Sequence, residues 1–129
     1  MPVINVSLFN GRSHDDKNAI CKTIIQEMKS AFKIEHNNFH CRIHEYSETE
    51  MIVPPVSSKN YISIEITFLP GKSVSEKEYF YKNLQKKLLS FNIKENDIII
   101  ILQEPILENW YIRGKTGIEI KSLNQTKTK

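Results

Sequence analysis

The residue with the clearest chemical potential is Pro2, which directly follows Met1. Proline is small enough to permit removal of the initiator methionine, and its nitrogen would then be a secondary amine fixed at the start of a strand. An ordinary α-amine has a pKa of roughly 7.7–8.0, and partial burial or nearby cations lower that value. A neutral amine near pH 7 can take a proton from the carbon beside a carbonyl and return it elsewhere. The alternative is that Pro2 only begins a strand, a position that proline tolerates.

Two cations stand in matching surroundings along the chain. Arg12 and Lys72 each lie between a glycine and a serine. The match extends in both directions, so that residues of about 2–51 and 61–110 form two weak copies of one unit. Arg12 and Lys72 are therefore expected at equivalent positions of a duplicated fold.

Each copy has the pattern of a strand, a helix and a second strand. Apolar and polar residues alternate over 3–9 and again over 61–69, which is the period of two that marks a strand. Ser13 and Ser73 can each cap a helix, and apolar residues follow them at helical spacing. The closing strands are predicted at about 39–46 and 97–103.

The connections predict an α+β fold. A helical crossover makes the two strands of each copy parallel, and two copies joined by short right-handed connections give a mixed four-stranded sheet with both helices on one face. We expect a single domain over 1–120, in which the proline-containing segment 53–58 is a connecting loop. Residues 121–129 are polar and are expected to form a flexible tail.

The stretch Ile98–Leu102 is apolar without interruption. A strand of this composition needs cover on both faces of its sheet, whereas the two predicted helices cover only one. We therefore expect another copy of the chain to cover the second face, so that the protein self-associates.

Composition limits the class of protein. Hydrophobic residues make up 40% and charged residues 26% of 129 residues, which is typical of a packed soluble domain, and no apolar stretch reaches the ~18 residues of a membrane helix. The net charge of +3 is carried by Lys121, Lys127 and Lys129, so no nucleic-acid partner is expected. Cys21 and Cys41 are too few for a disulfide framework, which favours a reduced, cytoplasmic protein.

Metal and cofactor sites are not expected. His36, His40 and His44 recur at every fourth residue, a spacing that could bind zinc on a helix, but here the pattern is a loop followed by a strand. The sequence contains no glycine-rich phosphate loop and no cofactor motif.

Pro2 after Met1, a strand, Gly-Arg-Ser, a helix and a repeat of the same unit together resemble the tautomerase superfamily, which includes 4-oxalocrotonate tautomerase and macrophage migration inhibitory factor. The resemblance covers about residues 2–117. Within the superfamily, the chain is similar to the fused-repeat group of malonate semialdehyde decarboxylase. That similarity lies in the stretch from Ala31-Phe32 to Glu50-Met51, the helix Lys77 to Tyr81 and the turn Glu108-Asn109-Trp110.

The resemblance implies that Pro2, freed of Met1, is the catalytic residue of a cofactor-independent isomerase that acts on a small 2-oxo or enol acid, and that the chain forms a homotrimer. It also implies that Arg12 binds a substrate carboxylate, which a guanidinium does bidentately. Lys72 is the equivalent residue of the second copy. The decarboxylase-like members carry arginine there and two residues earlier, where this sequence has Pro70.

Three further positions acquire candidate roles from the resemblance. Asn38 stands where the decarboxylase has an essential aspartate, whose charge an amide cannot supply. His40 falls where smaller tautomerases place a second carboxylate-binding arginine, and it could bind or polarise an oxygen or serve a subunit interface. Trp110 lies where 4-oxalocrotonate tautomerase has an active-site phenylalanine, and it could form a wall of the site or anchor an interface. Decarboxylase, hydratase or dehalogenase chemistry at Pro2, and a non-catalytic binding role, are the alternatives.

Overall fold

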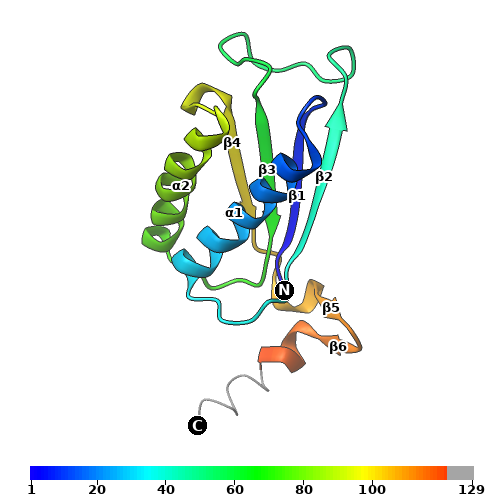
Figure 1. The fold of residues 1–129 in the computed structure, drawn as a ribbon. Helices are drawn as coiled ribbons and strands as arrows, with labels where there is room; N and C mark the ends of the chain where they lie inside the picture. Colours follow the sequence, from blue (N-terminus) through cyan, green and yellow to red (C-terminus); the bar gives the residue numbers. More distant parts are fainter. Residues whose placement is uncertain (122–129) are drawn as a thin grey trace.

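The computed structural model describes residues 1–121 of the chain. The strands and helices follow the expected order, and two short strands are added near the C-terminus (Figure 1). Their bounds are β1 Val3–Phe9, α1 His14–Phe32, β2 His40–Tyr46, β3 Ile62–Thr67, α2 Val74–Leu88, β4 Ile98–Gln103, β5 Tyr111–Ile112 and β6 Lys115–Thr116. Residues 117–121 form one further helical turn.

The main sheet has the mixed topology that the internal repeat predicts. Its strand order is β2-β1-β3-β4. Strands β1 and β2 are parallel, β3 and β4 are parallel, and the two pairs meet where β1 runs antiparallel to β3. Both helices lie on the same face of this sheet (Figure 1). The predicted α+β architecture is confirmed.

Serine caps begin both helices at the predicted places. The Ser13 hydroxyl accepts a hydrogen bond from the Asp16 N–H at 3.1 Å. Ser73 accepts one from the Glu76 N–H, and the Glu76 carboxylate accepts one from the Ser73 N–H at 2.9 Å, which completes a capping box. Because each cap fixes the start of its helix, it also fixes the glycine–cation turn just before it.

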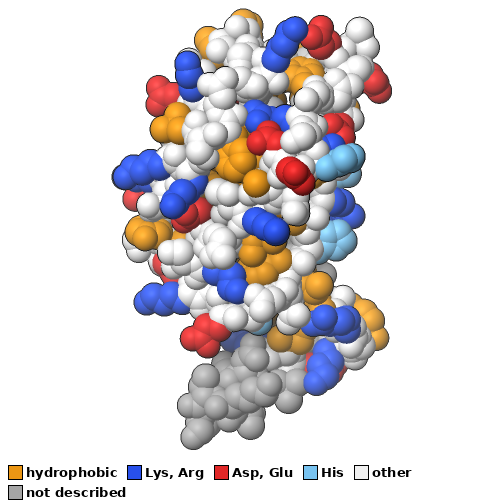
Figure 2. All heavy atoms as spheres, in the orientation of Figure 1, with side chains coloured by type: hydrophobic (Ala, Val, Ile, Leu, Met, Phe, Trp, Pro, Cys, Tyr) orange, Lys and Arg blue, Asp and Glu red, His pale blue; other side chains and the backbone are white. Residues whose placement is uncertain are grey.

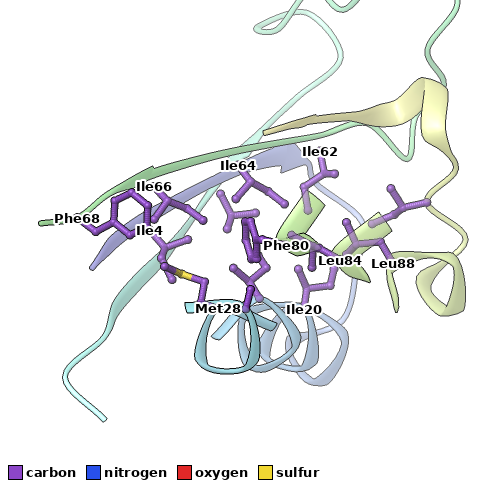
Figure 3. Close-up of a cluster of buried hydrophobic side chains, with 14 of the residues drawn as sticks. Ile4, Ile20, Met28, Ile62, Ile64, Ile66, Phe68, Phe80, Leu84 and Leu88 are labelled. Carbon is purple, nitrogen blue, oxygen red and sulfur yellow. The ribbon is translucent and has the colours of Figure 1, made fainter. Parts of the chain in front are cut away.

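One apolar core fills the space between the sheet and the helices (Figure 3). The strands contribute alternate side chains, such as Ile4, Ile64 and Ile66, and the helices contribute Met28 and Phe80 among others; all five are fully buried. Burying aliphatic side chains of this size is worth about 1.5–3 kcal/mol each. The core therefore holds the ends of the central strands in fixed positions.

The opposite face of the sheet has no helix against it. The side chains of β4 alternate, and Ile99 and Ile101 lie on this face with 40% and 41% of their surface exposed. Across the sheet, Ile101 pairs with Glu65, which in turn pairs with Asn5. The expectation that one face of the apolar strand is left without cover in a single chain is confirmed.

The C-terminal part of the domain is more ordered than expected. Strands β5 and β6 pair in an antiparallel hairpin that the sequence did not predict, and the helical turn of 117–121 follows it. Lys121, expected to begin a flexible tail, belongs to this turn; the rest of that expectation, residues 122–129, lies outside the described residues. Neither helix of the described chain is long and apolar enough to cross a bilayer.

Candidate active site

A cavity of about 390 Å³ lies at the end of the sheet where the chain begins. Its walls come from the N-terminus, the α1–β2 loop, the end of β3 and the C-terminal hairpin. The lining residues are Met1, His36, Asn38, Leu69, Ile112, Arg113, Lys115 and Ile120. None of them is acidic, so the cavity is suited to an anionic ligand.

Pro2 directly follows Met1, which lines the cavity. The Pro2 side chain is buried, and its carbonyl accepts a hydrogen bond from the His40 N–H at 3.0 Å. Burial lowers the pKa of the Met1 amine below its ordinary value, and the charges of Lys72 and Arg113 lower it further. The start of the chain is thus held in an environment that favours a neutral amine.

Sheet topology brings Lys72 to the N-terminus. Because β1 and β3 are antiparallel, Val3 pairs with Thr67, and the turn that follows β3 lies beside the start of β1. The Lys72 ammonium lies 5.9 Å from the ring centre of Phe32 and 6.0 Å from that of Phe68. Rings at this distance attract a cation and hold the charge near the amine. Lys72 therefore acts electrostatically on the Met1 amine but lines a neighbouring cavity, which shares Leu69 and Ile120 with the cavity beside Met1.

The α1–β2 loop supplies His36 and Asn38 to the cavity wall. The Asn38 N–H donates a hydrogen bond to Nδ1 of His36 at 3.1 Å. Burial lowers the pKa of His36, and the N-terminal amine, Lys29 and Lys72 lower it further. His36 is consequently neutral near pH 7, with its other ring nitrogen available to a ligand as a hydrogen-bond donor.

The β5–β6 hairpin forms the remaining wall with Ile112, Arg113 and Lys115. Figure 2 shows basic side chains gathered over this hairpin. Trp110 fixes its base, because the indole N–H donates to the Pro105 carbonyl at 3.0 Å and the Trp110 carbonyl accepts from the Gly117 N–H at 2.9 Å. Trp110 thus supports the wall and is not one of the residues that line the cavity.

Arg12 lies at the other end of the sheet. Strand β1 separates it from Pro2, and its guanidinium donates to Asp16 at 2.7 Å, to the Phe91 carbonyl at 3.0 Å and to Asn60 at 3.4 Å. Within one chain, the structure therefore does not bring Arg12 to the cavity beside Pro2. The reason is the antiparallel β1–β3 pair, which places the turn of each copy next to the start of the other copy.

The other predicted site residues divide into two groups. Asn38 lines the cavity and Lys72 lies close to the amine, as described above. His40 is exposed on β2, and its backbone N–H donates to the Pro2 carbonyl.

The histidines at every fourth residue form no cluster with other potential ligands, and residues 1–121 contain no group of three side chains that could hold a metal ion.

His36, Arg113 and Lys115 line the cavity but were not predicted from the sequence as site residues. The hairpin consists of two strands of two residues each, which is too short for an alternating pattern to reveal. A turn signal was present, since Gly114 follows Arg113 between two short β-prone segments. His36 was considered only as a metal ligand.

Comparisons with known proteins agree with this fold. A family described as "Tautomerase enzyme" matches residues 37–113. The probable tautomerase YusQ of Bacillus subtilis (strain 168) is 22% identical over 116 residues, which cover 85% of this chain and 91% of YusQ. The structure of malonate semialdehyde decarboxylase is similar with a TM-score of 0.81 and 20% identity, over 93% of this chain and 97% of that one. A fused 4-OT, a symmetric trimer, has a TM-score of 0.79 and 15% identity, over 90% and 96%.

Proposed function

The chain belongs to the tautomerase enzyme family, and from this premise we propose that it is a cofactor-independent tautomerase in which the Pro2 amine moves a proton on a small 2-oxo or enol acid. The observation that carries this proposal is the cationic cavity at the N-terminus, in which burial and two nearby cations lower the pKa of the terminal amine.

Removal of Met1 is the step that makes the site competent. Met1 lines the cavity and Pro2 is buried behind it, so loss of Met1 enlarges the cavity and leaves the Pro2 nitrogen as its wall. The nitrogen then changes from an amide, which has no base strength, to a secondary amine. The hydrogen bond from His40 to the Pro2 carbonyl keeps the ring in place through this change.

The lining residues supply complementary roles. Lys72 binds the substrate carboxylate, because it lies on the turn beside the start of β1 and its charge acts on the terminal amine. The neutral amine takes a proton from the carbon beside the carbonyl and returns it to the other end of the enol system. His36 or Asn38 donates a hydrogen bond to the oxygen on which negative charge develops.

The internal repeat explains why one end of the sheet carries the activity. At the other end of the sheet, Arg12 takes the place of Lys72 and the start of β3 takes the place of the start of β1. Because β3 begins at Ile62 in the middle of the chain, its backbone nitrogen is an amide and no free amine is present there. Asp16 also neutralises Arg12 there. The duplicated fold therefore keeps a single proton-transfer site.

Decarboxylation is the second candidate, because malonate semialdehyde decarboxylase has the same fold. The charge of the cavity argues against it as the first choice. Asn38 lines the wall and no carboxylate does, so the negative charge that the decarboxylase uses is missing. A protonated Pro2 would be needed, whereas burial, Lys72 and Arg113 lower the pKa of the amine of Met1, and we expect the same surroundings to favour a neutral Pro2 once Met1 is removed.

We further propose that three copies associate through the open face of the sheet. Ile99 and Ile101 are exposed on this face, and burying apolar surface stabilises association. The similarity to a fused 4-OT that is a trimer supports a closed ring of three chains.

The experiment that tests the function compares Pro2→Ala with the wild type on a carboxylated enol such as phenylenolpyruvate. Alanine keeps a terminal amine but loses the rigid ring, and we expect kcat to fall by about 10²-fold or more. The matched control is Pro55→Ala, which removes an exposed proline from the connecting loop and should leave kcat unchanged. Equal rates for Pro2→Ala and the wild type would refute the mechanism.

A further inference from the structure

We propose that Arg113, at the tip of the β5–β6 hairpin, is a specificity-determining residue that binds a second anionic group of the substrate. The site then prefers an acid with anionic groups at both ends to the matching acid with one. The proposal rests on the proposed function, because it concerns the same cavity, and it assigns this preference to a single side chain.

The first line of evidence is the uncompensated positive charge at the cavity. Arg113 and Lys115 line the cavity, and Lys72 stands close to the amine. The carboxylates that form ion pairs within residues 1–121 are Asp16, Glu45, Glu48 and Glu104, and none of them pairs with these three cations. One carboxylate of a substrate would leave much of this positive charge uncompensated.

The second line of evidence is the position of the two cations. Arg113 lines the cavity together with Met1 and comes from the C-terminal hairpin, whereas Lys72 follows β3, and the charges of both lower the pKa of the Met1 amine. The two cations thus come from separate elements near the terminal amine. A substrate whose reacting carbon lies against the Pro2 nitrogen can place one anionic group at Lys72 and extend the other toward Arg113.

The third line of evidence is the backbone conformation of the hairpin turn. Arg113 and Gly114 join β5 to β6 as a two-residue turn with φ values of 46° and 89°, the pattern of a type I′ turn. Asparagine or glycine favours the first position of this turn, and a long side chain does not. An arginine there is held on a short rigid support, because Trp110 and Gly117 fix the base of the hairpin.

The choice of side chain agrees with this role. A guanidinium presents a planar fork of donors that matches a carboxylate, and it stays charged throughout the physiological range of pH. Lys115 adds a second positive charge on the next strand. Together they form an anion-binding wall opposite the sheet.

The test measures binding by calorimetry, with glutarate and pentanoate as probes. These two acids have the same chain length and differ by one carboxylate. The central variant is Arg113→Asn, because asparagine favours the left-handed turn while the guanidinium and its charge are removed. The control Lys94→Ala removes one charge at the other end of the sheet, where Lys94 lines a separate cavity. Thermal unfolding establishes that each variant is folded.

We expect the wild type and Lys94→Ala to bind glutarate about tenfold more tightly than pentanoate, as one charge-assisted hydrogen-bonded pair provides. Arg113→Asn should abolish this preference and leave the affinity for pentanoate unchanged, whereas Arg113→Lys should keep part of it. An equal preference in Arg113→Asn and the wild type, or no preference in the wild type, would overturn the proposal.

The two proposals fail separately. Pro2→Ala should retain the preference for glutarate, because binding requires no proton transfer. If Pro2→Ala also retains full activity, the proposed function is wrong while the assignment of Arg113 as an anion-binding residue stands.

Discussion

The carboxylate of Glu104 binds the backbone of Lys72. Glu104 follows β4 directly, and its Oε2 accepts hydrogen bonds from the N–H groups of Lys72 at 3.2 Å and Gly71 at 2.9 Å. The same carboxylate pairs with Lys77 on α2. Glu104, at the end of edge strand β4, thus fixes the turn that carries Lys72. The first copy of the repeat has a matching ion pair between Lys17 and Glu45.

Replacement of Glu104 by glutamine should lower stability in a pH-dependent manner. Burial raises the pKa of Glu104, but the hydrogen bonds from Lys77, Lys72 and Gly71 outweigh it, so the pKa lies below its ordinary value. A carboxylate of this kind contributes stability above the unfolded pKa of roughly 4.3, and the contribution is lost as the pH falls through the folded value.

We therefore expect Glu104→Gln to lower the free energy of unfolding by about 1–2 kcal/mol at pH 7, and by progressively less below about pH 4. Urea unfolding at a series of pH values measures this difference. Glu48→Gln is the control, because Glu48 pairs with Lys59 at an exposed site, and such pairs contribute little. A deficit for Glu104→Gln that grows toward acid pH would contradict the assignment.

The equivalent cations Arg12 and Lys72 should behave differently when each is replaced by alanine. Arg12→Ala breaks an ion pair and a hydrogen bond to the Phe91 carbonyl, so it should lower stability by about 1–2 kcal/mol and leave KM unchanged. Lys72→Ala should raise KM for a carboxylated substrate severalfold, because carboxylate anchoring is mostly uniform binding. Steady-state kinetics and urea unfolding separate the two effects. A raised KM in Arg12→Ala would show that Arg12 reaches a substrate in the assembled protein.

Charge on the open face of the sheet should break the assembly. Ile101 is 41% exposed there, and Ile101→Glu would place a carboxylate in an apolar interface, which is costly. Analytical ultracentrifugation should find about three times the chain mass of 15.1 kDa for the wild type and the chain mass for Ile101→Glu. Val74→Glu is the control, because Val74 is exposed at the start of α2 on the helical side. A wild-type monomer at micromolar concentration would contradict the proposed trimer.

The hairpin should depend on the absence of a side chain at Gly117. A Cβ at this position would lie 2.2 Å from the Leu107 carbonyl oxygen and 3.0 Å from the Trp110 Cβ. Gly117→Ala should therefore lower the free energy of unfolding by about 1–3 kcal/mol, observed as a lower Tm, and weaken glutarate binding as Arg113→Asn does. Ile118→Ala is the control, because Ile118 is the next residue of the same helical turn and 55% of its surface is exposed. An unchanged Tm in Gly117→Ala would show that the backbone adjusts freely.

The repeat made most of the fold predictable from the sequence. The alternation in β1 and β3, together with the Ser13 and Ser73 caps, set the elements within a residue or two, because local sequence determines strand faces and helix starts. The position of Arg12 was not predictable in the same way. It depends on the antiparallel pairing of β1 with β3, which is a long-range contact. This pairing places the turns that follow the two strands at opposite ends of the sheet.

The cavity was predictable only in part. The repeat and the family resemblance predicted Asn38, which lines the cavity, and also Pro2 and Lys72, which lie near the N-terminus but are not among its lining residues. Arg113 lies in the turn between two strands of only two residues each, and its approach to the N-terminus arises from tertiary packing at Trp110 and Gly117. No local pattern encodes that packing.

The proposed mechanism requires a free Pro2 amine of lowered pKa, which nitrogen NMR of protein labelled with ¹⁵N-proline would detect. Every other proline lies within the chain, so its nitrogen is an amide and does not titrate. We predict one proline nitrogen that titrates with a pKa below the ordinary range of roughly 7.7–8.0, because the amine of the chain is buried near Lys72 and Arg113. The absence of a titrating proline nitrogen, or a pKa within or above that range, would contradict the account.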